Sequence, residues 1–360
     1  MTKHLTVYEN CSLGGIVSVI RERMRVLQPR GVEEYFYFMK DRGGVASLRD
    51  EGARHIWLGH LGVDNNIYNL IQQESISSVT LFSHFHLARN LKRDGCTVYV
   101  EMHDCPPATA APIGAVQGSV DKVVVPSAWS RDWVHAEAGV PLKDIEVVPN
   151  FINMSIFCAD GRAPLTTSHP RPVLWVGRLD ERKNWRDAAY IASILKRRGL
   201  RIEPVFVLSL RYEDEYVHDF VDQLALLGIE EDTKVYYNIS QNNLAAMMRD
   251  FAHRGGCYLS TSRLESYGLG IVEALACGLP VVASAVGAVP EHMVHGDSGY
   301  LFPFGERFVA ANLVEECLFV RQSRSRVLAG MKQLDVDAKR SQAVEQLYYM
   351  YSGRAGMPIT

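Results

Sequence analysis

The sequence lacks a long hydrophobic run, an excess of charge of one sign and a cysteine-rich segment. No stretch of 18 apolar residues occurs, and the first 15 residues hold no continuous apolar segment, so we expect neither a membrane-spanning helix nor a secretion signal. The seven cysteines are odd in number, widely scattered and without a CxxC pair, which argues against a disulfide framework and against a cysteine metal site. These absences predict a soluble, cytoplasmic protein.

The charges are balanced along the chain. Its 38 Lys and Arg residues face 41 Asp and Glu residues, a net charge of −3, and the first 160 residues hold 15 basic against 18 acidic side chains. Neither part has the basic excess that nucleic-acid binding requires, so we expect no nucleic acid as a partner. Apolar residues make up 47% of the chain, which is typical of globular proteins, and 360 residues fit two domains.

Short apolar runs rich in Val, Ile, Phe and Tyr alternate with longer periodic stretches, a pattern typical of βα units that build a parallel sheet. The alternation breaks at residues 158–172, which are rich in Pro, Gly, Ser and Thr and which we interpret as a linker. We therefore predict an α/β fold with two Rossmann-like, doubly wound domains, 1–157 and 173–337, whose ligand lies in a cleft between them. A C-terminal helix of about residues 338–360 is expected to pack back on the first domain. Strands are expected at residues 4–8, 34–39, 55–58, 78–82, 97–102, 122–126, 145–148, 173–176, 205–208, 234–237, 256–259 and 281–283.

The most informative segment is residues 260–280, where a strand leads through a glycine-containing loop into a helix. Gly268 lets the backbone approach a ligand closely, and the helix that begins near Leu269 presents unpaired N–H groups to an anion. Glu265 precedes the start of this helix and Glu273 follows it. Two carboxylates on either side of a phosphate-compatible helix start suit a ligand with hydroxyls on both sides of a diphosphate, such as a nucleotide sugar.

A second segment, residues 173–185, also runs from a strand through a loop into a helix, and it carries Arg178 and Lys183 after the strand. A guanidinium holds phosphate oxygens as a fork and an ammonium acts as a point charge, so the two could neutralise a diphosphate without a metal. The alternative is that both cations form surface ion pairs with the acidic residues at positions 180, 181 and 187.

With these two segments, the chain resembles a retaining GT-B glycosyltransferase of family 4, the glycosyl transferases group 1. The resemblance extends over nearly the whole chain, and it implies a GT-B fold, two Rossmann-like domains facing a central cleft. It also implies transfer of a hexose-type sugar from a nucleotide diphosphate sugar to an acceptor hydroxyl. Further motifs that match in order are Gly14-Gly15 and residues 98–104, 121–130, 147–150 and 287–303.

The resemblance implies a role for each matching residue. Arg178 and Lys183 are expected to hold the diphosphate, Glu265 the hydroxyls of the donor sugar, and Glu273 those of the ribose. His103 is expected to lie beside the transferred sugar. Together with Arg178, Lys183 and Glu265 it forms the expected set of catalytic residues. The other expected donor-binding residues are Gly14, Gly15, Gly177, Ile239, Tyr267, Gly268 and Leu269.

No isolated carboxylate in these motifs offers itself as a nucleophile, so retention is expected by a front-face route. Asp335-Val-Asp337 looks like the metal-binding DxD of another glycosyltransferase architecture, but its place before the closing helix favours capping, and we expect no metal. No cofactor is expected beyond the nucleotide sugar, with a UDP-sugar favoured over a GDP-sugar. The slightly acidic N-terminal part favours a saccharide or small-molecule acceptor.

Other functions stay open. The same architecture serves isomerases that epimerise nucleotide sugars at C2, and a catalytically silent binding subunit is a third reading. The helix after Gly15 carries arginines at positions 21, 23, 25 and 30 beside apolar residues, which would allow a weak contact with an anionic membrane and a lipid-linked acceptor. A solvated charged face is the preferred interpretation of that helix. One departure from the family is Asn184, which follows Lys183 where glycine is frequent.

Overall fold

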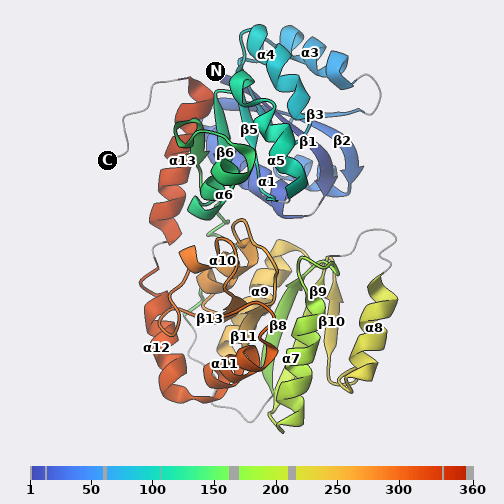
Figure 1. The fold of residues 1–360 in the computed structure, drawn as a ribbon, viewed down its shortest axis with the longest axis vertical. Coiled ribbons are helices and arrows are strands. Elements are labelled where there is room, and N and C mark those ends of the chain that lie inside the picture. Colours follow the sequence, from blue (N-terminus) through green and yellow to red (C-terminus); the bar gives the residue numbers. More distant parts are fainter. Residues whose placement is uncertain are drawn as a thin grey trace. The chain divides into compact units, whose positions relative to one another are not determined.

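The computed structural model describes residues 2–12, 14–59, 63–105, 107–161, 170–209, 216–334 and 336–353. The chain divides into two compact units, one formed by Met1–Phe151 together with Asp337–Thr360 and the other by Ile152–Val336. Each unit contains one sheet, and every strand pair in both sheets is parallel (Figure 1).

The sheet of the N-terminal unit has seven strands in the order β3-β2-β1-β4-β5-β6-β7. Because β1 lies between β2 and β4, the strand order reverses beside β1, and such a reversal is where doubly wound sheets bind ligands. The elements of this unit are β1 (Thr2–Ser12), α1 (Gly15–Leu27), β2 (Val32–Arg42), α2 (Gly44–Asp50), β3 (His55–Leu58), α3 (Val63–Glu74), β4 (Ser78–Leu81), α4 (Ala88–Arg93), β5 (Thr97–Glu101), α5 (Pro107–Gly114), β6 (Lys122–Val125), α6 (Ala128–Ala138), β7 (Ile145–Val147) and, at the end of the chain, α13 (Val336–Ser352).

The sheet of the C-terminal unit has six strands in the order β10-β9-β8-β11-β12-β13, so its reversal lies between β8 and β11. The elements of this unit are β8 (Arg171–Gly177), α7 (Trp185–Arg197), β9 (Ile202–Leu208), α8 (Tyr216–Leu226), β10 (Lys234–Tyr237), α9 (Gln241–His253), β11 (Cys257–Ser260), α10 (Leu269–Ala276), β12 (Val281–Ser284), β13 (Tyr300–Phe302), α11 (Arg307–Phe319) and α12 (Arg321–Met331).

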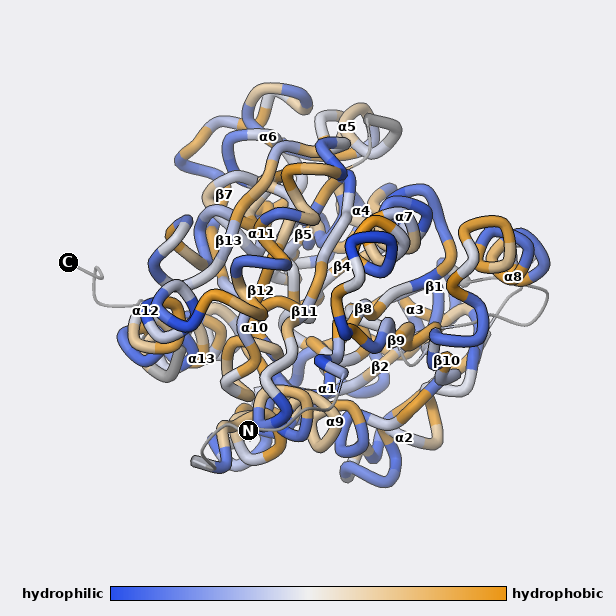
Figure 2. Tube along the Cα trace, turned by 90° about the horizontal axis from the view of Figure 1, so that it is seen from below, coloured by the Kyte–Doolittle hydropathy of each residue, from blue (hydrophilic) through white to orange (hydrophobic). Residues whose placement is uncertain are grey.

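Apolar patterning explains why these segments become strands and helices. Central strands consist mostly of apolar residues, and Leu174 of β8, Leu259 of β11 and Val282 of β12 are at most 1% exposed. The helices alternate apolar and polar residues, as the hydropathy colouring of the trace shows (Figure 2). A strand covered on both faces needs a continuous apolar run, whereas a helix that covers it needs only one apolar face.

The last helix, α13, belongs to the N-terminal unit. Its Ala343 and Leu347 are fully buried in a cluster that includes Leu27 of α1. The Tyr351 ring stacks on His4 of β1 at 3.6 Å between ring centroids. The chain thus returns to the unit in which it began, and α13 helps to cover that sheet.

The predicted fold class, α/β with two doubly wound domains, is confirmed, and each of the twelve predicted strands is present. The sequence analysis missed β13, which has only three residues, because so short an apolar segment resembles a turn. Of the predicted linker, residues 162–169 lie outside the described residues. None of the described helices combines the length and the apolar character that crossing a membrane demands.

Candidate functional site

Two loops of the C-terminal unit meet at the point where its strand order reverses, one after β8 and one after β11. Trp175, near the end of β8, donates its ring N–H to the Thr261 hydroxyl at 3.2 Å. The backbone N–H of Arg263 donates to the Arg182 carbonyl at 2.8 Å. Residues after the two strands are therefore held side by side at the carboxyl edge of the sheet, the edge that binds ligands in such folds.

Lys183 and Glu265 face each other across these loops. Lys183 Nζ lies 2.5 Å from Glu265 Oε1, and the Ser262 hydroxyl donates to the same oxygen at 2.7 Å. The Lys183 side chain is 32% exposed and that of Glu265 is 12% exposed, so both reach the surface without being fully solvated. The ammonium keeps N–H donors beyond the one that this ion pair uses, and they can serve a bound anion.

Asp180 organises the loop that carries both cations. One of its carboxylate oxygens lies 2.8 Å from Arg178 Nη2, and the other accepts the backbone N–H of Lys183 at 2.9 Å. Arg178 therefore has the surface ion pair that the sequence left open as an alternative, whereas the Lys183 side chain pairs with Glu265 instead. The Arg178 side chain remains 37% exposed, which leaves its guanidinium accessible.

Helix α7 begins at Trp185, two residues after Lys183, and the local sequence explains how. Asn184 adopts a left-handed conformation with φ 51°, where an asparagine replaces the frequent glycine of the family at low cost. Its amide donates to Asp187 at 2.7 Å, and the next residue, Trp185, is fully buried. The buried indole anchors the helix start and with it the position of Lys183.

The start of α10 provides backbone donors beside Glu265. Gly268, at φ 89°, is the residue before the helix, and the first turn from Leu269 contains no acidic side chain. A helix start without a side-chain acceptor presents its N–H groups and the positive end of the helix dipole to a ligand. Tyr267, which precedes them, is 7% exposed, and burial raises the pKa of its phenol.

The two carboxylates of this segment act on one buried phenol. Glu273 is half-buried on α10. Burial raises the pKa of Tyr258 on β11, and the negative charges of Glu265 and Glu273 raise it further. The predicted residues Gly177, at the end of β8, and Ile239, after β10, lie at the same carboxyl edge. Ile239 follows an edge strand, two strands away from β8.

In the N-terminal unit, Gly14 and Gly15 begin α1 after the central strand β1. Gly14 is the capping residue, and it makes no side-chain cap, while the first turn from Gly15 lacks an acidic residue. The amide groups of this helix start therefore resemble those of α10 in what they offer an anion.

His103 follows β5 and takes part in a buried network. Its Nε2 lies 2.7 Å from Glu101 Oε1, and its Nδ1 lies 3.2 Å from the Asn150 amide nitrogen. Arg23 of α1 donates to both oxygens of Glu101, at 2.6 and 2.5 Å. Burial alone would raise the pKa of Glu101, but the charge of Arg23 and then the hydrogen bond from His103 lower it to about 2.

Sequence reasoning missed three of these contributors: Ser262, Glu101 and Arg23. Arg23 was assigned to a solvated face of its helix, but it is 3% exposed because Glu101 neutralises it inside the unit. Alternation along a strand could have indicated Glu101, since residues two apart share a face and Glu101 stands two before His103.

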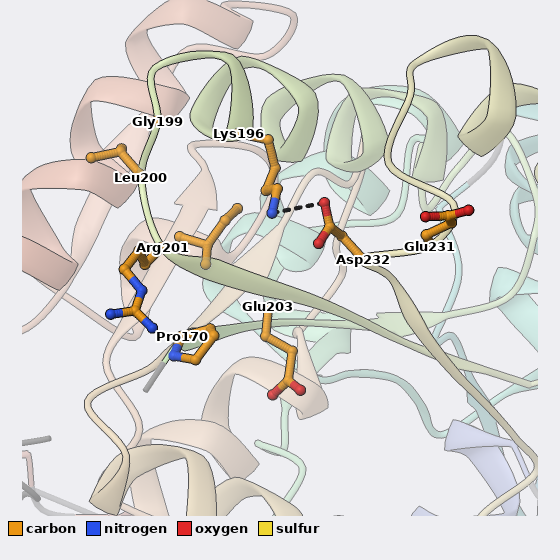
Figure 3. A pocket seen from close by; sticks show the side chains of 9 residues that line it. Pro170, Lys196, Gly199, Leu200, Arg201, Glu203, Glu231 and Asp232 are labelled. Carbon is orange, nitrogen blue, oxygen red and sulfur yellow. Dashed lines mark ion pairs between the residues drawn. The ribbon is translucent and has the colours of Figure 1, made fainter. Parts of the chain in front are cut away.

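A cavity of about 400 Å³ lies at the opposite edge of the C-terminal sheet (Figure 3). Pro170, Ile202 and Asp232, which line it, stand at or just before the amino ends of β8, β9 and β10. Its Lys196 and Asp232 form an ion pair at 2.7 Å. Since ligands of doubly wound sheets bind at the carboxyl edge, this cavity is separate from the candidate site.

No group of three or more His, Cys, Asp or Glu side chains in the described part of the chain is arranged to hold a metal ion. Of the predicted Asp335-Val-Asp337 motif, Asp335 lies outside the described residues.

Comparison with known proteins finds a family match in the C-terminal part of the chain. Residues 162–327 match the family described as glycosyl transferases group 1. The solved structure of Alr3699/HepE from Anabaena, in complex with UDP-glucose, superposes with a TM-score of 0.81 at 18% identity and covers 96% of this chain and 99% of that chain. At this identity the likeness shows the fold, which is GT-B.

Curated relatives match over about half to two thirds of this chain. Glycogen synthase of Mycobacterium tuberculosis is 28% identical over 179 residues, which are 50% of this chain and 41% of that protein. D-inositol 3-phosphate glycosyltransferase 1 of Catenulispora acidiphila is 28% identical over 256 residues, 68% of this chain and 60% of that protein. The matches thus span less than two thirds of either relative.

Proposed function

Because residues 162–327 match the glycosyl transferases group 1 family, we propose that this chain is a retaining glycosyltransferase of that family. It moves a hexose-type sugar from a nucleotide diphosphate sugar to a hydroxyl of a saccharide or small-molecule acceptor. The observation that carries this proposal is the pairing of Lys183 with Glu265 beside the start of α10. There a cation, a carboxylate and the backbone N–H groups at the start of α10 lie together at the ligand-binding edge of one sheet.

The donor site divides by chemistry. Arg178, Lys183 and the N–H groups at the start of α10 suit the oxygens of the diphosphate, because all are donors and two are charged. Glu265, which Ser262 and Lys183 hold from one side, has acceptor capacity left for sugar hydroxyls, and Glu273 would accept from the ribose.

The reaction proceeds on one face of the sugar. The bond between C1 of the sugar and the diphosphate oxygen breaks, the acceptor oxygen bonds to C1 from the same side, and the acceptor proton passes to the leaving phosphate. Negative charge develops on the diphosphate as the bond breaks, and Arg178 and Lys183 stabilise it, which is electrostatic catalysis by prearranged charges. His103 and Gly15, of the N-terminal unit, are assigned to the sugar and to the diphosphate.

The proposed donor is a UDP-sugar. Support comes from the solved Alr3699/HepE structure, which contains UDP-glucose and shares the fold over 96% of this chain. The acceptor is proposed to be uncharged, because the first 160 residues carry 15 basic against 18 acidic side chains and offer no excess of positive charge for an anionic one.

The test has two stages. UDP and GDP are first titrated into the protein and followed by thermal shift, where a binding nucleotide raises the melting temperature. The UDP-sugar that binds is then incubated with and without saccharide acceptors, and the anomeric configuration of the product is determined by NMR. Retained configuration in an acceptor-dependent product supports the proposal, whereas an epimerised nucleotide sugar without acceptor would show the isomerase instead.

A further inference from the structure

We propose that Glu101 is a positioning residue for His103, fixing the imidazole proton on Nε2, and that Arg23 keeps Glu101 in the anionic form this requires. The family resemblance assigns no role to Glu101 or Arg23. Their proposed role rests on the proposed function only in taking His103 as the ring beside the transferred sugar.

The geometry dictates where the proton of the ring is. Glu101 Oε1, 2.7 Å from His103 Nε2, belongs to an ionised carboxylate, which can only accept hydrogen bonds. Nε2 must therefore carry the hydrogen. The other ring nitrogen, Nδ1, faces the Asn150 amide nitrogen at 3.2 Å and can accept from it. With a hydrogen bond at each nitrogen, the ring has one orientation and one tautomer.

Arg23 makes this arrangement durable. The side chains of Arg23 and Glu101 are 3% and 2% exposed, and the guanidinium binds both carboxylate oxygens as a fork. A carboxylate buried without a partner would take up a proton and could then donate to the ring instead of accepting from it. Glu101 Oε1 is shared between Arg23 Nη2 and His103 Nε2, so one atom links the ion pair to the imidazole.

The ring is also confined from its face. The Phe82 ring, after β4, stacks on the His103 ring at 5.3 Å between centroids. Arg23 in turn lies over the Phe82 ring, with its guanidinium carbon 6.0 Å from the Phe82 centroid. In this proposal the His103 ring, held in one orientation, contacts the sugar and does not transfer a proton. This fits a reaction in which the leaving phosphate takes the acceptor proton.

The test replaces Glu101 by glutamine in the full chain. A glutamine of the same shape can present either its oxygen or its NH₂ group to the ring, so it no longer dictates the tautomer. The ¹⁵N shifts of the His103 ring nitrogens are expected to show the Nε2–H tautomer alone in the unaltered protein and a mixture in E101Q. Sugar transfer is expected to show a kcat lower by about 10- to 100-fold, with the dissociation constant for UDP unchanged.

A matched control separates positioning from simple support of the fold. Glu22, on α1, is another buried carboxylate, 4% exposed and paired with Arg25 at 2.9 Å. E22Q also breaks the ion pair of a buried carboxylate, although Arg25 itself is 31% exposed, and it should lower the melting temperature while leaving the His103 tautomer and kcat as they were. Loss of the fixed tautomer in E22Q as well would overturn the specific role of Glu101.

The outcome is decisive whether or not the enzyme is active. A sole Nε2–H tautomer in E101Q would overturn the proposal. A protein with the fixed tautomer that transfers no sugar would uphold the positioning and refute the proposed function, because the NMR signal does not depend on turnover. Should E101Q fail to fold, Glu101→Asp, which keeps the charge but withdraws the carboxylate by about 1.5 Å, tests the same contact by the same shifts.

Discussion

Lys183 and Glu265 are separated by 82 positions in the sequence, yet Lys183 Nζ and Glu265 Oε1 are 2.5 Å apart. They follow β8 and β11, neighbouring parallel strands between which the order of the sheet reverses. An ion pair with one side chain about one-third exposed contributes at most about 1 kcal/mol to stability. The pair therefore matters less for stability than for positioning the Lys183 ammonium and the Glu265 carboxylate beside the start of α10.

Replacing Lys183 by alanine should lower kcat for sugar transfer by roughly 10²- to 10³-fold, because a prearranged positive charge on the leaving diphosphate is lost. The melting temperature should change little, since the ion pair that is lost is partly exposed. Initial rates with saturating UDP-sugar, together with a thermal melt, measure both effects.

Lys196 provides the matched control for this change. It is 28% exposed and paired with Asp232 at 2.7 Å, but it lies at the opposite edge of the same sheet. Lys196→Ala should leave transfer at the level of the unaltered protein. Equal activity of both variants would mean that Lys183 does not hold the diphosphate.

Adding a methyl group at Gly177 should disturb Lys183 without removing it. A Cβ at Gly177 would lie 2.8 Å from the buried Trp175 ring and 3.2 Å from Lys183 Cγ, so the lysine stem has to move. Gly177→Ala is expected to weaken UDP binding about tenfold, or about 1.4 kcal/mol, as calorimetric titration would show. Gly118→Ala, where a Cβ meets nothing within 4 Å, should bind UDP normally. If Gly177→Ala also binds normally, Lys183 is not confined by Gly177.

Local pattern explains why so much of the fold could be predicted. The apolar runs of β8 and β11 predict strands. The glycines and charged residues directly after these runs predict ligand-binding loops, because parallel strands bring the loops that follow them to one edge of the sheet. The contacts between the loops could not be predicted in this way. Glu265 pairs with Lys183 only because β8 and β11 are neighbours in the sheet, which no short window of the sequence contains.

The network around His103 shows the same limit more sharply. Arg23 and Glu101 are 78 positions apart, and each alone looks like a solvated charge. The two side chains can be buried only together, because the paired hydrogen bonds between them replace the water that the Arg23 guanidinium and the Glu101 carboxylate lose. A pairwise condition of this kind is invisible to the helical periodicity that assigned Arg23 to the surface.

Glu265 depends on a close approach of backbone to backbone. Gly287 has φ 55°, and a Cβ there would lie 2.0 Å from the Glu265 carbonyl oxygen, while the N–H of Ala288 donates to that same oxygen at 2.8 Å. Gly287→Ala should therefore displace Glu265, abolish measurable transfer and lower the free energy of unfolding by roughly 2 to 4 kcal/mol, through backbone strain and overpacking. Urea unfolding and transfer assays measure the two effects.

Gly296 isolates the part of this effect that comes from conformation alone. It also has a left-handed φ, 76°, but a Cβ there meets nothing within 4 Å. Gly296→Ala should cost only about 1 kcal/mol and retain transfer. A Gly287→Ala protein with normal transfer would contradict the dependence of Glu265 on this contact.

The stability of the N-terminal unit should depend on pH through Glu34 of β2. Burial raises the pKa of Glu34 to about 8, although Arg23 opposes the shift, and Glu34 is 4% exposed. The pKa of Glu34 in the folded protein lies above the ordinary value of 4.5. The stability that the neutral Glu34 carboxyl contributes is therefore complete below about pH 4.5 and is lost as the pH rises towards 8. The loss is at most about 1.4 kcal/mol per pH unit.

Glu34→Gln, which keeps the neutral shape, isolates this effect. Burial also lowers the pKa of His4 to about 3, so the protonation of His4 opposes folding as the pH falls below 6.5, but this term is common to both proteins and cancels in their difference. Relative to Glu34→Gln, the unaltered protein should lose stability steadily between pH 5 and pH 8 in urea unfolding. A constant difference between the two proteins over that range would mean that Glu34 is already ionised in the folded protein at pH 5.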